Sequence, residues 1–168
     1  PGNSAGPGQL LVELASVGVT PDDIDIVAFT HLHPDHVGWN LVQETPDGAW
    51  APRFRNARYL VPEADFASYK AREQVHPLIR EQALAMEGMP CLELVAGDGA
   101  VVPALTGIWT PGHTPGHRSF VVESGGDLYL HAEGLVMERL PSDKDLIVPL
   151  MRELLEMNGA LPDAVRLA

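Results

Sequence analysis

Residues 30–36 read Thr30-His31-Leu32-His33-Pro34-Asp35-His36, and they directly follow an apolar run, residues 24–29, that predicts a β-strand. Side chains two residues apart on an extended chain point to the same side, so His31 and His33 can converge on one ion. The turn that begins at Pro34 can direct the neighbouring Asp35 and His36 toward a second site. Imidazole and carboxylate ligands suit zinc, and also manganese, iron or cobalt. Three of the seven histidines of the chain lie in this loop, which favours a metal site over a polar loop with accidental histidines.

The pattern His31-x-His33-x-Asp35-His36 at the end of a strand resembles the signature of the metallo-β-lactamase-fold hydrolases. A second likeness is the run Thr-Pro-Gly-His-Thr-Pro-Gly-His at residues 110–117, because in that family a Gly-His-Thr-x-Gly-His loop supplies the third histidine of the first metal. Shorter segments resemble the branch that contains lactone and organophosphate hydrolases, at residues 37–40, 47–50, 54 and 56–59. The likeness runs from about Gly8 to Met137.

This resemblance implies an α+β fold, the metallo-β-lactamase-like αββα sandwich, in which two sheets pack together with helices outside them. The pattern of strands, hairpins and helices along the chain agrees with that arrangement. Residues 1–168 are expected to form a single domain, and a chain of this length can bury a core. Relative to the family, the fold is expected to be truncated at both ends, with N-terminal strands before Pro1 and a further C-terminal segment.

Local patterns predict the elements around the two histidine loops. Helices are expected at residues 9–17, 62–72, 77–87 and 145–157. A short helix is expected to open at residues 37–42, with its N-terminus facing the metals. Strands are expected at residues 58–61, 91–95, 105–109, 118–123 and 127–131, and a hairpin turn at residues 46–48.

The family's ligand set can be carried over to this chain residue by residue. By resemblance, His31, His33 and His113 would hold the first metal, and Asp35 and His36 would hold the second. The last histidine of the family, a ligand of the second metal, has no match in the chain. Either it lies beyond the C-terminal residue or this protein lacks it, and truncation is the simpler account.

Family members also have a carboxylate, usually aspartate, that bridges the metals at the end of the strand after the second histidine loop. Glu133 is the candidate for this bridge, although its side chain is one methylene longer. His131, two residues earlier and on the same side of a strand, is a competing ligand, and the third alternative is that neither residue binds. We expect His117 to hydrogen-bond its own loop and so orient His113. Trp39 either lines the substrate pocket or packs in the core.

Charge and cysteine content limit the partners. The chain has 11 basic and 23 acidic residues and a net charge of −12. Such a surface repels phosphate backbones and anionic lipids, so neither nucleic acid nor membrane is an expected partner. The single cysteine, Cys91, excludes an internal disulfide and fits a reducing, cytoplasmic location. A small-molecule substrate is the expected partner, and assembly as a homodimer is left open.

The predicted chemistry follows from the ligands. A metal held by neutral histidines lowers the pKa of bound water from near 16 to roughly 7, which makes hydroxide available at neutral pH. Asp35 is expected to be catalytic, orienting this nucleophile or passing a proton to the leaving group. We expect no nucleophile elbow, because the Gly-x-Ser-x-Gly run at residues 2–6 lies in a stretch rich in glycine and proline and not between a strand and a helix. The sequence therefore predicts a zinc-dependent hydrolase, with two zinc ions or else iron or manganese, that attacks a small ester, most simply a lactone. The alternatives are a mononuclear iron dioxygenase of the same fold and a catalytically inactive metal-binding scaffold.

Overall fold

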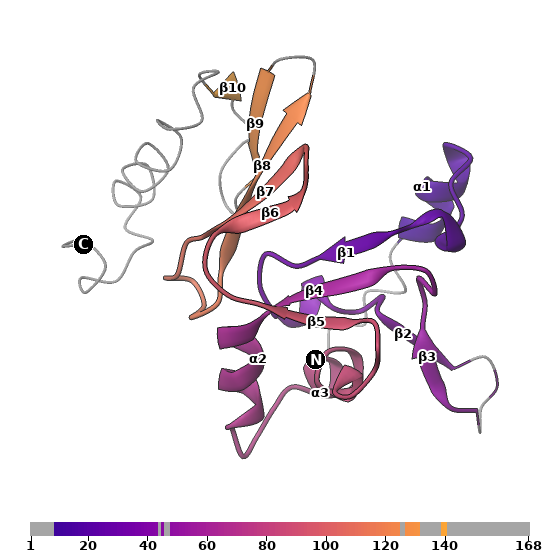
Figure 1. Ribbon diagram of the computed structural model, residues 1–168. Coiled ribbons are helices and arrows are strands. Elements are labelled where there is room, and N and C mark those ends of the chain that lie inside the picture. Colours follow the sequence, from indigo (N-terminus) through magenta and orange to yellow (C-terminus); the bar gives the residue numbers. More distant parts are fainter. Residues whose placement is uncertain (1–8, 44, 46–47, 125–126, 132–138, 141–168) are drawn as a thin grey trace.

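The structure is a computed structural model that describes residues 9–43, 45, 48–124, 127–131 and 139–140. Two sheets dominate these residues (Figure 1). The parallel sheet has the strand order β1-β4-β5 and consists of β1 (Ile26–Ala28), β4 (Arg58–Pro62) and β5 (Leu92–Val95). The antiparallel sheet has the order β10-β9-β8-β7-β6 and consists of β6 (Gly99–Val102), β7 (Leu105–Trp109), β8 (Arg118–Ser124), β9 (Asp127–His131) and β10 (Arg139–Leu140).

Helices cover the outer face of the parallel sheet. The α-helices are α1 (Leu10–Ser16), α2 (Glu63–Lys70) and α3 (Pro77–Gln82), and single 3-10 turns occur at Pro21–Asp23, Pro34–His36 and Leu84–Met86. In Figure 1, α2 and α3 lie on the side of the parallel sheet that faces away from the antiparallel sheet. This layer order of helices, sheet and sheet agrees with the predicted α+β class. None of the helices in the described part of the chain is long and apolar enough to cross a membrane.

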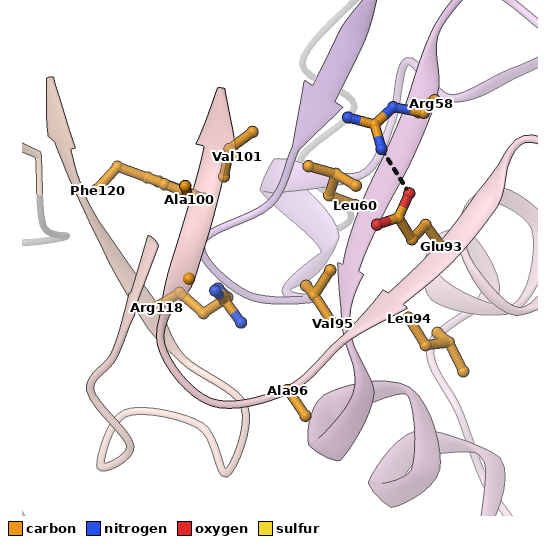
Figure 2. A pocket seen from close by; sticks show the side chains of 11 residues that line it. Arg58, Leu60, Glu93, Leu94, Val95, Ala96, Ala100, Val101, Arg118 and Phe120 are labelled. Atoms are coloured by element: carbon orange, nitrogen blue, oxygen red, sulfur yellow. Dashed lines mark hydrogen bonds and ion pairs between the residues drawn. The ribbon is translucent and has the colours of Figure 1, made fainter. Parts of the chain in front are cut away.

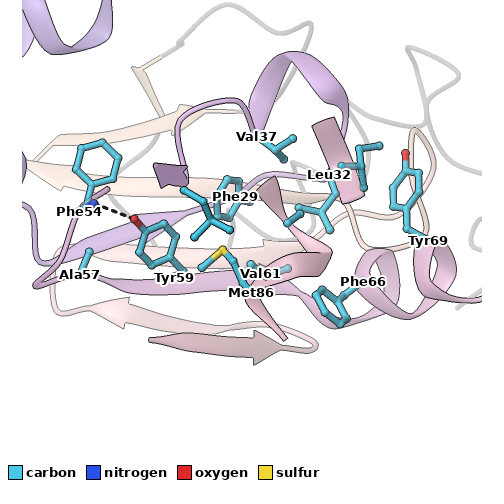
Figure 3. Packing of buried hydrophobic residues seen from close by; sticks show 13 residues of the cluster. Phe29, Leu32, Val37, Phe54, Ala57, Tyr59, Val61, Phe66, Tyr69 and Met86 are labelled. Atoms are coloured by element: carbon cyan, nitrogen blue, oxygen red, sulfur yellow. Dashed lines mark hydrogen bonds between the residues drawn. The ribbon is translucent and has the colours of Figure 1, made fainter. Parts of the chain in front are cut away.

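The main hydrophobic core lies between the parallel sheet and these helices (Figure 3). Strand β4 is buried over most of its length, and its alternate residues Tyr59 and Val61 belong to this core. The Tyr59 hydroxyl accepts a hydrogen bond from the Phe54 N–H at 3.0 Å and donates one to the Asn40 carbonyl at 3.2 Å. Each fully buried large apolar side chain contributes about 1.5–3 kcal/mol. The core therefore fixes the position of the C-terminal end of β1, where the first histidine loop begins.

The two sheets meet at the two histidine loops. The first loop follows β1, and the second loop joins β7 to β8. The Arg118 N–H, at the start of β8, donates a hydrogen bond to the Thr30 carbonyl at 2.8 Å. This backbone contact holds the loops side by side although more than 80 residues separate them in the sequence.

Most of the predicted elements are confirmed, including the strands that precede both loops and the hairpin of β2 (Leu41–Gln43) and β3 (Trp50–Pro52). The helix expected at residues 37–42 is wrong. Val37 and Leu41 are both buried, a spacing of four that also suits a helix. However, Leu41 pairs with β3, and its N–H donates to Gln82 Oε1 at 2.8 Å. These tertiary contacts stabilise a strand at residues 41–43 instead of a helix.

Two further differences concern later elements. The helix expected at residues 77–87 is shorter, because α3 ends at Gln82 and a 3-10 turn, Leu84–Met86, follows it. Strand β6 was not predicted. The helix expected at residues 145–157 and the candidate bridge Glu133 lie outside the described residues.

Candidate metal centre

The first loop presents two imidazoles from an extended backbone. Leu32 is fully buried, which anchors the loop in the core, and His31 and His33 flank it. His31 is itself fully buried, and its Nδ1 lies 3.0 Å from Thr30 Oγ1. The other ring nitrogen, Nε2, lies 3.0 Å from His33 Nδ1. His31 and His33 therefore converge, as expected from the alternation of side chains along an extended chain.

His113 of the second loop completes a group of three imidazoles. Its ring centroid is 4.7 Å from that of His31 and 4.6 Å from that of His33, with the rings nearly perpendicular. One nitrogen from each of the three rings lies within 4.8 Å of the others. Two nitrogens bound to one tetrahedral zinc ion are about 3.4 Å apart. Small ring rotations would therefore let the three histidines hold one ion, and this donor set fits zinc.

The charge state of His31 also suits a metal ligand. Burial, and to a smaller extent charge repulsion from the neighbouring His36, His33, His117 and His113, together lower the pKa of His31 from 6.5 to about 3. The imidazole of His31 is therefore neutral at physiological pH. Only neutral imidazole carries the nitrogen lone pair that binds a metal.

The candidates for the second metal lie beside this group. The 3-10 turn Pro34–His36 places the His36 ring centroid 4.4 Å from that of His31. The Asp35 carboxylate lies 3.6 Å from His36 Nε2, and its side chain is 79% exposed. Within the described part of the chain, the group close enough for one ion contains His31, His33 and His113 but not Asp35. The assignments to a second metal therefore stay predictions.

His117 lies near the group formed by His31, His33 and His113 but does not belong to it. Its ring is buried, 5.5 Å from the His31 ring and 6.0 Å from the His113 ring. Its Nδ1 lies 2.9 Å from Thr110 Oγ1 and 3.1 Å from the Thr110 carbonyl oxygen, and the Thr110 N–H donates to the His117 carbonyl at 2.9 Å. These contacts connect the two ends of the second loop. The orienting role of His117 toward His113 stays a prediction.

A cavity of about 260 Å³ lies beside His36, directly after the first histidine loop, although none of His31, His33 and His113 lines it. Trp39 and His36 line it together with Phe54, Phe120 and His131. The Arg53 guanidinium stacks over the Trp39 ring, 5.1 Å from its centroid. The predicted substrate residue Trp39 and the competing ligand His131 therefore face the same cavity as His36.

A second cavity, of about 300 Å³, lies between β5 and β6 (Figure 2). Leu60, Val95 and Phe120 line it, and the guanidinium of Arg118 faces it. Burial lowers the pKa of Arg118, and within the described residues its Nη1 has no hydrogen-bond partner. None of the histidines that the structure describes lines this cavity, whereas His36 and His131 line the first one, so the first cavity is the better candidate for a substrate site.

Sequence reasoning missed one residue of this region, Asp65. Its side chain is fully buried, and it accepts hydrogen bonds from the Leu32 N–H at 3.0 Å, the Thr114 hydroxyl at 2.8 Å and the Gly116 N–H at 2.6 Å. The partners lie 33, 49 and 51 residues away in the sequence. The only local signal is an acidic residue in the first turn of a helix, which is typical of ordinary helices.

Comparison with known proteins defines the family. A family model described as the metallo-beta-lactamase superfamily matches residues 1–130. The chain belongs to this superfamily. It is 31% identical over 116 residues to an N-acyl homoserine lactonase of Bacillus cereus, a match that covers 69% of this chain and 40% of the relative. It is 28% identical over 149 residues to the N-acyl homoserine lactonase AttM of Agrobacterium fabrum, covering 82% of the chain and 44% of the relative. The chain thus spans about 40% of the length of the curated relatives it matches.

Solved structures agree with this assignment. A probable metal-dependent hydrolase from Staphylococcus aureus superposes with a TM-score of 0.62 at 24% identity, covering 77% of this chain and 45% of that one. An N-acyl homoserine lactone hydrolase with N-hexanoyl-L-homoserine at its catalytic metal centre superposes with a TM-score of 0.50 at 28% identity, covering 70% and 40%. The predicted fold and the likeness to the lactonase branch are confirmed.

Proposed function

We propose that this chain forms the metal-binding part of a zinc-dependent hydrolase that opens small lactones. The observation that carries this proposal is the meeting of His31, His33 and His113, because one nitrogen from each ring lies within 4.8 Å of the other two. Membership of the metallo-beta-lactamase superfamily supports the reaction class. The relatives are called N-acyl homoserine lactonases, which makes this class of lactone the first substrate to test.

The proposed roles follow the two loops. His31, His33 and His113 would hold the first metal, and Asp35 and His36 would hold the second. Glu133 is the proposed bridging carboxylate. Zinc is the first candidate because three neutral imidazoles are a common zinc ligand set in hydrolytic sites, and iron or manganese are the other options.

When bound, a zinc ion in such a site would make hydroxide available at neutral pH and polarise the attacked oxygen. The exposed carboxylate of Asp35 is proposed to orient the attacking water or to pass its proton to the leaving oxygen. The cavity beside His36 would take the apolar part of the ester, since aromatic side chains line it. The acidic chain, with a net charge of −12, favours a neutral substrate over an anionic one. The single domain, the homodimer and the cytoplasmic location stay predictions.

The test is elemental analysis of the protein purified without added metal, followed by assays on a panel of N-acyl homoserine lactones, simple esters and phosphotriesters. We expect bound zinc and the fastest turnover on a lactone. Bound iron together with oxygen uptake would favour the dioxygenase alternative. Tight metal binding without turnover on any member of the panel would favour an inactive scaffold.

A further inference from the structure

We propose that Asp65 is a positioning residue that holds the two histidine loops in the arrangement needed to bind a metal. This inference rests on the proposed function, because it assumes that His31, His33 and His113 share an ion. It concerns a residue that contacts none of these three side chains in the hydrogen bonds that it accepts.

The carboxylate of Asp65 connects both loops at once. Its Oδ2 accepts from the N–H of Leu32, which lies between the two histidines of the first loop, at 3.0 Å. The same oxygen accepts from the hydroxyl of Thr114, the residue after His113, at 2.8 Å. Its Oδ1 accepts from the N–H of Gly116 at 2.6 Å. All three partners are donors, which matches an ionised carboxylate that can only accept.

The carboxylate of Asp65 is attached to a helix that packs against the core. Asp65 lies in the first turn of α2, directly after β4, and the next turns of the helix bury Phe66 and Tyr69 in the core. The first loop follows a strand of the parallel sheet, whereas the second loop belongs to the antiparallel sheet. Asp65 therefore ties a loop of one sheet to a loop of the other.

The second loop approaches α2 so closely that one of its positions needs glycine. A Cβ atom on Gly116 would lie 2.7 Å from the Asp65 backbone nitrogen and 2.9 Å from Asp65 Oδ1. Two of the three donors bound by Asp65 lie within three residues of His113. Because His113 itself is exposed, these contacts fix its backbone where packing of its own side chain does not.

Replacement of Asp65 by asparagine tests this role at constant size. Asparagine offers one acceptor and one donor group, so its amide N–H₂ must face either Gly116 or the pair formed by Leu32 and Thr114. One of the loops then loses its acceptor. Loss of such supporting contacts typically lowers metal affinity roughly 10–100-fold. Replacement of Thr114 by valine removes a single contact of the set, and replacement by serine keeps it.

The experiment measures Co²⁺ binding by competition with a coloured chelator, the visible absorption spectrum of bound Co²⁺, and the unfolding free energy of the metal-free protein. We expect Asp65→Asn and Thr114→Val to weaken Co²⁺ binding roughly 10–100-fold and to alter the spectrum. Thr114→Ser should restore wild-type affinity. The double variant should lose less affinity than the sum of the two single losses, because Asp65 and Thr114 share one hydrogen bond and act on the same loop.

Asp23→Asn is the matched control. Asp23 also accepts hydrogen bonds, from the Thr20 N–H at 2.8 Å and the Thr20 hydroxyl at 2.6 Å, but it lies on the surface at an isolated 3-10 turn. This variant should leave Co²⁺ affinity and spectrum unchanged.

Wild-type affinity and spectrum in Asp65→Asn, together with lower stability, would overturn the proposal and make Asp65 a purely structural residue. If Asp65→Asn fails to fold, the comparison of Thr114→Val with Thr114→Ser decides, and equal affinities would overturn it. Failure of the proposed function gives different results. Wild-type protein that binds Co²⁺ but opens no lactone would contradict the hydrolase and leave the role of Asp65 standing, whereas wild-type protein that binds no Co²⁺ at the three histidines would contradict the metal site itself.

Discussion

The loop after β1 and the loop between β7 and β8 bring their histidines to the same point by different means. The first loop carries two of the clustered imidazoles two residues apart, and His31 is fully buried. The second loop contributes only His113, which is exposed. Its neighbours Thr114 and Gly116 are bound by a carboxylate on α2, about 50 residues earlier in the chain. Local backbone geometry therefore sets the direction of the two imidazoles in the first loop, although Asp65 also binds Leu32 there. The position of His113, in contrast, depends on contacts made only in the folded protein.

Removal of a ligand from either loop should have the largest effect. His33→Ala and His113→Ala are each expected to abolish metal binding and activity, because two histidines alone hold an ion poorly. Elemental analysis and the lactone assay measure both quantities. His76→Ala is the control, since His76 is exposed at the start of α3. Full metal content in either variant of the cluster would show that its loop does not supply a ligand.

The next largest effect is expected from adding a methyl group at or beside each loop, because the two loops should differ in the stability that they lose. Gly116→Ala places Cβ 2.7 Å from the Asp65 backbone nitrogen and 2.9 Å from Pro62 Cβ, and neither atom can move aside easily. We expect a loss of about 1–3 kcal/mol in unfolding free energy, together with weaker metal binding. Chemical denaturation and chelator competition measure the two effects.

Gly38→Ala is the matched variant next to the first loop. No atom lies within 4 Å of the Cβ position of Gly38, so the change in stability should stay within about 0.5 kcal/mol. Equal losses in the two alanine variants would contradict the difference between the loops.

The same difference explains what the sequence could predict. The first loop was identified because its ligands follow a strand within a few residues, and the alternation of an extended chain sets their direction. The second loop was identified from its likeness to a family motif, not from its own pattern. The role of Asp65 was not predicted because the three hydrogen-bond donors that it binds lie 33 to 51 residues away in the sequence. Leu41 was misassigned for the same reason, since the Gln82 side chain that binds its N–H lies 41 residues further on.

A smaller effect is expected from pH on the metal-free protein. Burial and neighbouring histidines lower the pKa of His31 from 6.5 to about 3 in the folded state. Below pH 6.5 the unfolded chain therefore binds a proton at His31 that the folded protein does not, and stability falls as the pH decreases toward 3. The difference amounts to about 2 kcal/mol at pH 5. Above pH 6.5 this contribution is constant.

Urea unfolding in the presence of a chelator, between pH 7 and pH 4, measures this dependence. His31→Gln removes the titrating ring, so its stability should decline less steeply than that of the wild-type protein. Parallel declines would show that burial of the first loop does not govern the charge of His31.

The smallest effect concerns the tryptophan that accompanies each loop. Trp39 follows the first loop and lines the cavity that His36 shares. Trp109 precedes the second loop, is 45% exposed, and donates through Nε1 to the Pro115 carbonyl at 3.1 Å. It lines a different groove, beside α2, together with Glu63 and Val95. The two residues thus form a matched pair, of which only Trp39 faces the proposed substrate cavity.

Trp39→Leu should raise KM for an N-acyl homoserine lactone about 10-fold, with a smaller change in kcat, because it removes apolar contacts that ground state and transition state share. Trp109→Leu should leave KM unchanged. Steady-state kinetics over a range of acyl chain lengths measures both. If KM rises equally in the two variants, the cavity beside His36 does not select the substrate, and the first loop contributes ligands without contributing specificity.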